Sequence, residues 1–284
     1  MPTYTTANLA VISPASRSTI FQSPILFRTV NSNKVTGKNL AEYAWKQNLK
    51  RVVIFCNPND SYSNSMREEF RVSFMVNLGA EIVDGGQNCT HNLADPNFNV
   101  DKEVQDIVLD QNPAKAIVLF PDTNHVEIAG KIAKAHKDLI DKLQQTGNNN
   151  IPKIKLLGGD SLYGNEFLNK YSDSLEGLIL SVPWFRDAPK SRNFAEKAKD
   201  QWKGEVSWIT ATSFDATQAF IESFKLSPNL STATVLANLP KVNLSSNNTS
   251  GDEFIFDKNT REMKRSQILI MVKNGRFVLI LELN

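Results

Sequence analysis

Short runs rich in apolar residues recur along the chain, and segments with a helical spacing of apolar residues lie between them. The runs cover 51–56, 116–120, 153–157 and 177–182. In the intervening segments apolar side chains return every three or four residues. Strands that are apolar on both faces and alternate with amphipathic helices are typical of a parallel sheet with helices on both sides. The pattern therefore predicts an α/β fold with doubly wound parallel sheets.

Polar loops follow three of these runs, at 57–63, 121–125 and 158–161. Ligands of open parallel sheets bind outside the carboxyl ends of the strands, and right-handed crossovers bring these loops to one edge. In the third loop, a Gly-Gly pair allows a sharp turn directly before the carboxylate of Asp160. Asp160 is either a ligand-binding carboxylate at this edge or a residue that caps the following turn through its own backbone.

The character of the sequence changes after Pro183. Two helices are expected there, one over 194–202 and the other over 211–224. An Asn-Gly pair at 274–275 lies between two apolar runs, which predicts a β-hairpin near the end of the sequence. Helices that follow a completed α/β unit suggest a second domain, entered at 182–184.

A polar cluster follows the first short apolar segment, 8–12, which ends at Pro14 because proline does not fit inside a central strand. Hydroxyls, backbone N–H groups and one guanidinium suit a carboxylate or a phosphate, and a solvated turn is the alternative. The cluster consists of Ser13, Ser16, Arg17, Ser18 and Thr19.

Composition limits the classes of function. The chain has 284 residues, of which 32 are basic and 30 acidic, and no basic stripe stands out for a nucleic acid. No apolar run is long enough for a membrane span, and no signal peptide is recognised at the N-terminus. Cys56 and Cys89 are expected to form neither a disulfide framework nor a metal site, and Cys56 is expected to be inert. The three histidines share no ligand spacing, so no metal site is expected.

Other prominent residues are assigned to structure. Trp202 and Trp208 are expected in the core or between helices, and Asp215 is expected to cap or brace its helix. Ser65, with Glu68 three residues later, has the spacing of a capping box and predicts a helix start.

Several short segments occur in the order and spacing of a known family. They are Ile12-Ser-Pro14, Phe27-Arg-Thr29, the strand and loop 51–62, Leu157-Gly-Gly-Asp160 and Ser213-Phe-Asp-Ala-Thr-Gln-Ala219. With them the chain resembles the type I periplasmic substrate-binding proteins, especially the leucine/isoleucine/valine-binding branch of ABC transporters, over 9–281. The resemblance implies two α/β lobes joined by a hinge. These lobes close over a small ligand, with no cofactor and no catalysed reaction.

The resemblance also implies roles for individual residues. In branched-chain amino-acid binders, the turn after Ser-Pro binds the α-carboxylate and an acidic residue after the Gly-rich strand end binds the α-ammonium. A tyrosine covers the ligand, and a further contact follows the next buried strand, where the family often has an aromatic residue. By position these roles fall on Ala15, Ser16 and Arg17 for the carboxylate, Asp160 for the ammonium, Tyr62 for the cover, and Asp122 and Thr123 for the further contact.

The sequence departs from the family pattern in two ways. The family's opening βα units are absent before Leu9, so the first lobe is expected to be incomplete, as in an N-terminally truncated product, an excised fragment or a chain completed by a partner. Arg17 replaces a small hydroxyl residue and Asp122 adds a carboxylate, which favours a polar or acidic amino acid, or an amide, as ligand. The expected division is the end of lobe I over 1–28, an α/β lobe II over 29–182, a mainly helical return to lobe I over 183–265, and a C-terminal hairpin near the hinge over 266–284.

The expected function is reversible binding of an amino acid or amide as the substrate-binding component of an ABC transporter. The resemblance implies a periplasmic or other extracytoplasmic location and the transporter's membrane subunits as partners, without membrane insertion and without a nucleic acid. One alternative is a ligand-sensing domain of a receptor or kinase, and another is a chain that no longer binds a ligand. The third is an α/β enzyme, although the sequence has no G-x-G-x-x-G, no phosphate-binding Gly-Lys-Ser/Thr loop and no G-x-S-x-G elbow.

Overall fold

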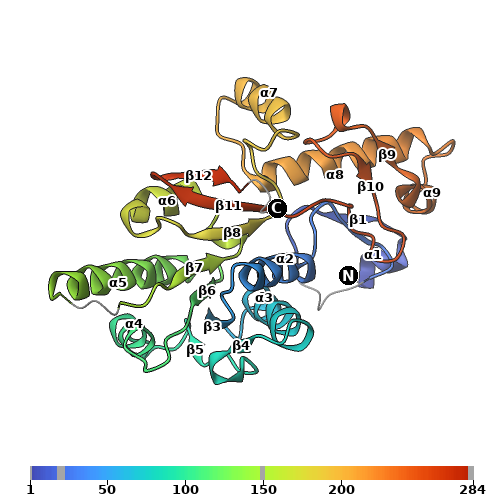
Figure 1. Ribbon diagram of the computed structural model, residues 1–284. Coiled ribbons are helices and arrows are strands. Elements are labelled where there is room, and N and C mark those ends of the chain that lie inside the picture. The colour runs from blue at the N-terminus through green and yellow to red at the C-terminus, as the bar shows by residue number, and fades with distance from the viewer. Residues whose placement is uncertain (1, 18–22, 148–150, 281–284) are drawn as a thin grey trace. The chain divides into compact units, whose positions relative to one another are not determined.

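The computed structural model describes residues 2–17, 23–147 and 151–280 (Figure 1). The chain forms two compact units. Unit 1 contains Met1–Ser32 and Pro183–Ile268, and unit 2 contains Asn33–Val182 and Leu269–Asn284. Each unit is therefore assembled from two separate stretches of sequence.

Unit 2 is built on a sheet with the strand order β12-β11-β8-β7-β6-β3-β4, in which β5 also pairs with β3. The strands from β4 to β8 are parallel to their neighbours, as predicted, and β11 and β12 form the predicted antiparallel hairpin. The strands are β3 (Arg51–Cys56), β4 (Glu81–Ile82), β5 (His91–Asn92), β6 (Ala116–Phe120), β7 (Lys155–Gly158), β8 (Ile179–Val182), β11 (Ile268–Lys273) and β12 (Arg276–Leu279).

Helices cover both faces of this sheet. Helices α2 and α3 pack against each other and bury Leu40, Met66 and Phe70 in one core with alternate residues of β3 and β6. Helices α4 and α5 pack together, α5 also packs against α6, and these three helices lie on the opposite face of the sheet (Figure 1). The helices are α2 (Asn33–Lys46), α3 (Ser61–Arg71), α4 (Val100–Val108), α5 (Val126–Gln145) and α6 (Asn165–Tyr171).

Helix α3 begins earlier than the capping-box spacing predicted. Its N-cap is Asp60, whose carboxylate accepts a hydrogen bond from Ser63 N at 2.8 Å. The predicted start at Ser65 is wrong because the upstream aspartate already satisfies the first free N–H groups of the helix. The predicted core stripe is confirmed, since Met66 and Phe70 of α3 and Phe74 of the π-helical segment Val72–Asn77 that follows are fully buried at four-residue spacing.

Cys56 and Cys89 form a disulfide, which corrects the expectation from the sequence. The two residues are 33 positions apart, and no spacing rule connects them. The pairing of β5 with β3, in which Asn92 lies opposite Cys56, brings the 89–92 segment to the carboxyl end of β3. The disulfide therefore depends on a short strand that the hydrophobic pattern did not reveal.

Reduction of this disulfide is expected to lower the free energy of unfolding by roughly 3–4 kcal/mol, because the bond closes a loop of intermediate length in the unfolded chain. Urea unfolding with and without dithiothreitol measures the change. A variant carrying both Cys56→Ala and Cys89→Ala is the control, since its unfolding midpoint should not respond to the reductant. Equal midpoints for the wild-type protein in both conditions would contradict the prediction.

Unit 1 combines helices with two small sheets, in which β1 pairs with β2 in parallel and β9 pairs with β10 antiparallel. Its apolar core joins α8 to these strands and contains Phe27, Leu239, Phe254 and Phe256. The elements are α1 (Pro2–Thr6), β1 (Val11–Ser13), β2 (Leu26–Arg28), α7 (Arg192–Trp202), α8 (Trp208–Lys225), α9 (Thr232–Asn238), β9 (Asn243–Leu244) and β10 (Phe254–Ile255).

Two tryptophans of unit 1 differ from each other in burial. Trp208 is buried at the start of α8, as predicted, but Trp202 is 49% exposed at the end of α7. The expectation of a core position for Trp202 is wrong because α7 ends there, with Lys203 in the left-handed conformation.

Over the described parts of the chain, none of the helices has both the length and the apolar character needed to cross a bilayer.

Candidate functional site

Three neighbouring strands of unit 2 end in polar residues at the same edge of the sheet. Strand β6 pairs in parallel with β3 on one side and with β7 on the other. The residues that follow these strand ends are Asn57, Asp122 and Asp160, and all three are buried. This edge is where open parallel sheets bind their ligands.

Asp160 and Tyr62, to which the family resemblance gives roles in one ligand site, lie together. The Tyr62 hydroxyl donates a hydrogen bond to Asp160 Oδ1 at 3.1 Å and accepts one from Ser161 N at 3.4 Å. Gly159 permits this approach, because a Cβ atom at that position would lie 2.5 Å from the tyrosine oxygen. The Gly-Gly-Asp sequence thus makes room for an aromatic hydroxyl beside a carboxylate that is 4% exposed.

Asp122 is held by donors from its own unit. Its Oδ2 accepts hydrogen bonds from Asn57 Nδ2 at 2.7 Å and from His125 Nδ1 at 2.6 Å, and its Oδ1 accepts one from Asn124 N at 2.8 Å. Burial alone would raise the pKa of Asp122, but these three hydrogen bonds outweigh it and hold the pKa below its ordinary value. The carboxylate is therefore ionised at neutral pH. Thr123, the neighbouring residue that was also predicted to contact the ligand, is exposed.

Asn57 and His125 belong to this edge, although no sequence pattern identified them as site residues. Asn57 directly follows β3, and its N–H donates to Ser63 Oγ at 2.6 Å. His125 directly precedes α5 and contacts Asp122. Their position at the ends of the first two polar loops was the signal that could have identified them.

Loss of the Asp122 carboxylate is expected to destabilise the protein in a pH-dependent way. A carboxyl group whose pKa is lowered on folding stabilises the folded state above its ordinary pKa, about 4, and this contribution disappears as the pH falls through the lowered value. Asp122→Asn should therefore show a deficit in unfolding free energy at pH 7 that shrinks in acid. Urea unfolding at several pH values, with the exposed Asp106→Asn as control, measures it. An equal deficit at every pH would contradict the assigned cause.

In unit 1, the predicted carboxylate-binding turn after β1 is fixed by hydrogen bonds. Ser16 N donates to Ser13 Oγ at 2.9 Å, and Ser16 O accepts from Arg28 Nε at 3.1 Å. Ala15 and Ser16 are exposed. Two further residues of the polar cluster, Ser18 and Thr19, lie outside the described residues.

Arg17, the third residue of this turn, is only 2% exposed. Its Nε donates to Asn31 O at 2.9 Å, and its guanidinium carbon lies 6.0 Å from the centre of the Trp208 ring. The turn thus combines a rigid backbone with a cation held against an aromatic ring.

Within the described residues no group of three or more His, Cys, Asp and Glu side chains has the arrangement of a metal site.

The chain is similar in structure to solved solute-binding proteins. The match to a leucine-binding protein from Thermotoga maritima covers 99% of this chain and 74% of the leucine-binding protein, with 18% sequence identity and a TM-score of 0.77. A branched-chain amino acid transporter substrate-binding protein from Streptococcus pneumoniae, in complex with isoleucine, matches 97% and 73%, with 18% identity and a TM-score of 0.72. An ABC transporter solute-binding protein from Rhodopseudomonas palustris, in complex with 3,4-dihydroxybenzoic acid, matches 98% and 72%, with 18% identity and a TM-score of 0.74.

These matches confirm the fold class predicted from the sequence. No protein-family model matches the chain, and no curated protein matches it significantly. The chain spans about three quarters of the length of the solved structures, which cover nearly all of it in return.

Proposed function

Because the chain has the fold of the type I periplasmic substrate-binding proteins of ABC transporters, we propose that it binds an amino acid or an amide as the substrate-binding component of such a transporter. Asp160 carries this proposal. Its buried carboxylate, at the carboxyl end of β7 and beside Tyr62, is the group that pairs with the ammonium of the ligand. Binding involves no chemical step.

A ligand ammonium suits Asp160 for an energetic reason. Hydrogen bonds between two charged groups are roughly twice as strong as those between neutral groups, and burial increases the difference. Tyr62 keeps one carboxylate oxygen oriented by its hydrogen bond, so the ligand meets an acceptor that is already in place. Tyr62 also shields the pair from water.

The turn at Ala15, Ser16 and Arg17 supports binding of the carboxylate end of the ligand. Its backbone is fixed by Ser13 and Arg28, so little conformational freedom is lost when an anion binds. Arg17 supplies a positive charge that a small hydroxyl residue would not. This charge favours ligands with an acidic or polar end.

Asp122 and Thr123 stay as predicted ligand contacts. Because three protein donors already surround the Asp122 carboxylate, we infer that it acts mainly by orienting Asn57 and His125. Those two side chains then offer an amide and an imidazole to the ligand.

The structural relatives differ in ligand, which makes the choice testable. One is in complex with isoleucine and another with 3,4-dihydroxybenzoic acid. Both ligands have a carboxylate, but only the amino acid has an ammonium group. A buried aspartate at the ammonium position favours the amino acid, since an aromatic acid would leave Asp160 facing uncharged or like-charged atoms.

The disulfide supports a location outside the cytoplasm. Disulfides persist in oxidising compartments such as the periplasm and are rare in the cytosol. Together with the fold, this supports the membrane subunits of an ABC transporter as partners.

A thermal-shift screen of the twenty amino acids and their simple amides, with 3,4-dihydroxybenzoate as the comparison ligand, tests the proposed function. At least one amino acid or amide is expected to raise the melting temperature in a concentration-dependent manner, because a ligand that binds only the folded state stabilises it. Stabilisation by the aromatic acid alone would reject the assignment of Asp160. No shift with any ligand would reject the binding function.

A further inference from the structure

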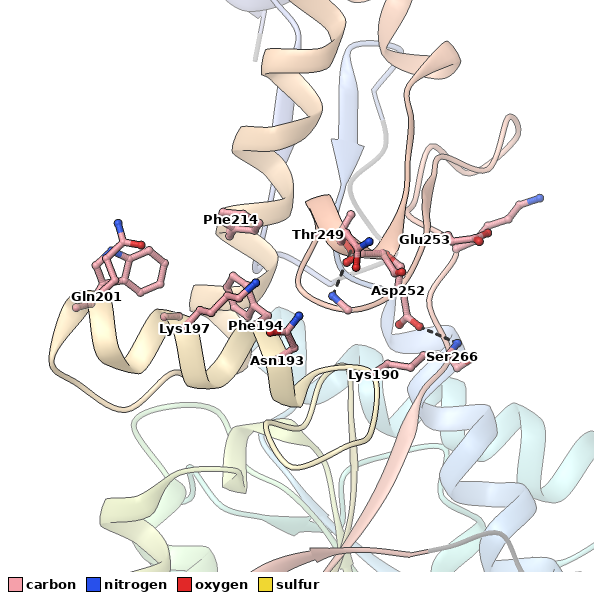
Figure 2. A pocket seen from close by; sticks show the side chains of 16 residues that line it. Lys190, Asn193, Phe194, Lys197, Gln201, Phe214, Thr249, Asp252, Glu253 and Ser266 are labelled. Atoms are coloured by element: carbon pink, nitrogen blue, oxygen red, sulfur yellow. Dashed lines mark hydrogen bonds and ion pairs between the residues drawn. The ribbon is translucent and has the colours of Figure 1, made fainter.

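A cavity lies entirely within unit 1, between α7 and the segment that follows α9 (Figure 2). Its volume is about 560 Å³, which is within the range of small-molecule sites. Asn193, Phe194 and Lys197 from α7 lie on one side, and Thr249, Asp252 and Glu253 lie across from them. None of these residues belongs to the amino-acid site proposed above.

The α7 wall combines an amide-rich stripe with an aromatic one. Asn193, Lys197 and Gln201 recur every four residues, so they share one side of the helix. The aromatic stripe begins at Phe194. The centre of its ring lies 4.8 Å from the ring centre of Phe214 in α8 and 6.4 Å from that of Trp202. The half-exposed indole of Trp202 is thus part of an aromatic surface at this cavity.

The opposite wall of the cavity is the turn 249–253, which hydrogen bonds to buried polar groups hold in place. Ser250 N and Oγ donate to Asp215 at 2.7 and 2.6 Å, and Ser250 O accepts from Trp184 Nε1 at 3.0 Å. Arg265 contacts both Asp215 and Ser250. The turn that presents Thr249 and Asp252 to the cavity therefore has a rigid base.

The buried polar network beneath this turn is not explained by a gain in stability alone. Asp215 and Arg265 are almost completely buried, and such pairs are often no more stabilising than apolar residues of the same size. Nε and Nη1 of Arg265 have no hydrogen-bond partner within the described part of the chain, although Nε is 3.9 Å from Asp252 Oδ2. A costly buried network that fixes a turn lining a cavity is the arrangement expected behind a preorganised binding wall.

The chemistry of the lining identifies the class of ligand. Asp252 is paired with Lys190 at 3.2 Å, and the lining carries both signs of charge, so the cavity selects neither a strong anion nor a strong cation. Amides, hydroxyls and carboxylates together donate and accept hydrogen bonds in all directions, which suits a ligand with many hydroxyl groups. The exposed Trp202 ring, next to the partly buried Phe194, suits the apolar face of a sugar ring.

We propose that this cavity of unit 1 is a carbohydrate-binding site for one or two sugar units, in which Trp202 stacks on a ring and Asn193, Gln201 and Asp252 bind its hydroxyls. The sugar is either free in solution or part of a glycan chain. The site is independent of the amino-acid site, because its residues come from α7 and the 249–253 turn.

Saturation-transfer NMR with maltose, cellobiose and N,N′-diacetylchitobiose tests the site on the whole protein. At least one disaccharide is expected to receive saturation and to bind with a dissociation constant in the millimolar range or tighter. Co-sedimentation with insoluble amylose, cellulose and chitin separates the two sources. Retention on a polymer, with release by its disaccharide, indicates a glycan chain, whereas binding of the disaccharide alone indicates a free sugar.

Trp202→Ala is expected to weaken this binding by about tenfold or more, since truncation of a central aromatic contact removes a large share of the binding energy. Gln201→Ala is expected to weaken it by a few-fold, since it removes a hydrogen bond to a sugar hydroxyl. Both side chains are exposed, so the folded state should be retained, which a thermal melt verifies. Trp45→Ala, which removes a comparably exposed tryptophan in unit 2, is the matched control. Absence of saturation transfer to all three disaccharides would overturn the proposal, and so would equal binding by the Trp202 variant.

Discussion

Asp160→Ala is expected to weaken amino-acid binding at least about a hundredfold, because removal of one partner of a buried charged pair costs several kcal/mol. The carboxylate is 4% exposed and accepts a hydrogen bond from Tyr62, so its loss leaves the ligand ammonium without its charged partner at a buried position. Isothermal titration calorimetry with the amino acid that gives the largest thermal shift measures the loss. Asp160→Asn keeps the shape and removes the charge, and it should lose nearly as much affinity.

Two further variants separate the charge of Asp160 from its surroundings. Asp106→Ala removes an exposed carboxylate of α4 and should leave the affinity unchanged. Tyr62→Phe removes the hydroxyl that donates to Asp160 and accepts from Ser161 N, and it should weaken binding by a few-fold to about tenfold. If Asp160→Ala binds the amino acid as tightly as the wild-type protein while remaining folded, the ammonium site is elsewhere.

Asp215→Ala is expected to lower the free energy of unfolding by about 3–5 kcal/mol, since it leaves the buried Arg265 without its counter-charge. The side chains of both residues are almost fully buried, and Ser250 would lose two hydrogen bonds at the same time. Urea unfolding followed by circular dichroism measures this loss.

The companion variant combines Asp215→Ala with Arg265→Met. It should recover a substantial part of the lost stability, because a buried apolar pair needs no charge compensation. A deficit below about 1 kcal/mol for the single variant would mean that water reaches Arg265 and compensates its charge. The control is Asp200→Ala, which removes an exposed carboxylate of α7 in the same unit, where the effect should be small.

Much of the fold could be predicted because its signals are local. The limits of β3 (Arg51–Cys56) and α5 (Val126–Gln145) follow from apolar runs and helical periodicity alone. The final hairpin follows from its Asn-Gly turn. The disulfide could not be predicted because it depends on β5, a strand of two residues whose pairing is decided by tertiary structure.

The candidate site divides in the same way. The proximity of Tyr62 and Asp160 follows from the rule that strand ends meet at one edge, together with the glycine that makes room for the tyrosine. The network around Asp122 could not be predicted, since it depends on which way the Asn57 and His125 side chains turn within their loops. Sequence patterns specify the backbone of these loops more closely than the partners of their polar groups.

The hairpin of β11 and β12 extends the sheet of unit 2 beside β8, although nearly all of the second segment of unit 1 separates them in the sequence. A ribosome therefore releases β8 long before the strand that covers its outer edge is made. During that interval the nascent chain carries an uncovered strand edge, which is prone to aggregation. We expect folding of unit 2 to be completed late in synthesis, and recombinant fragments that stop at Val182 to require a solubilising partner.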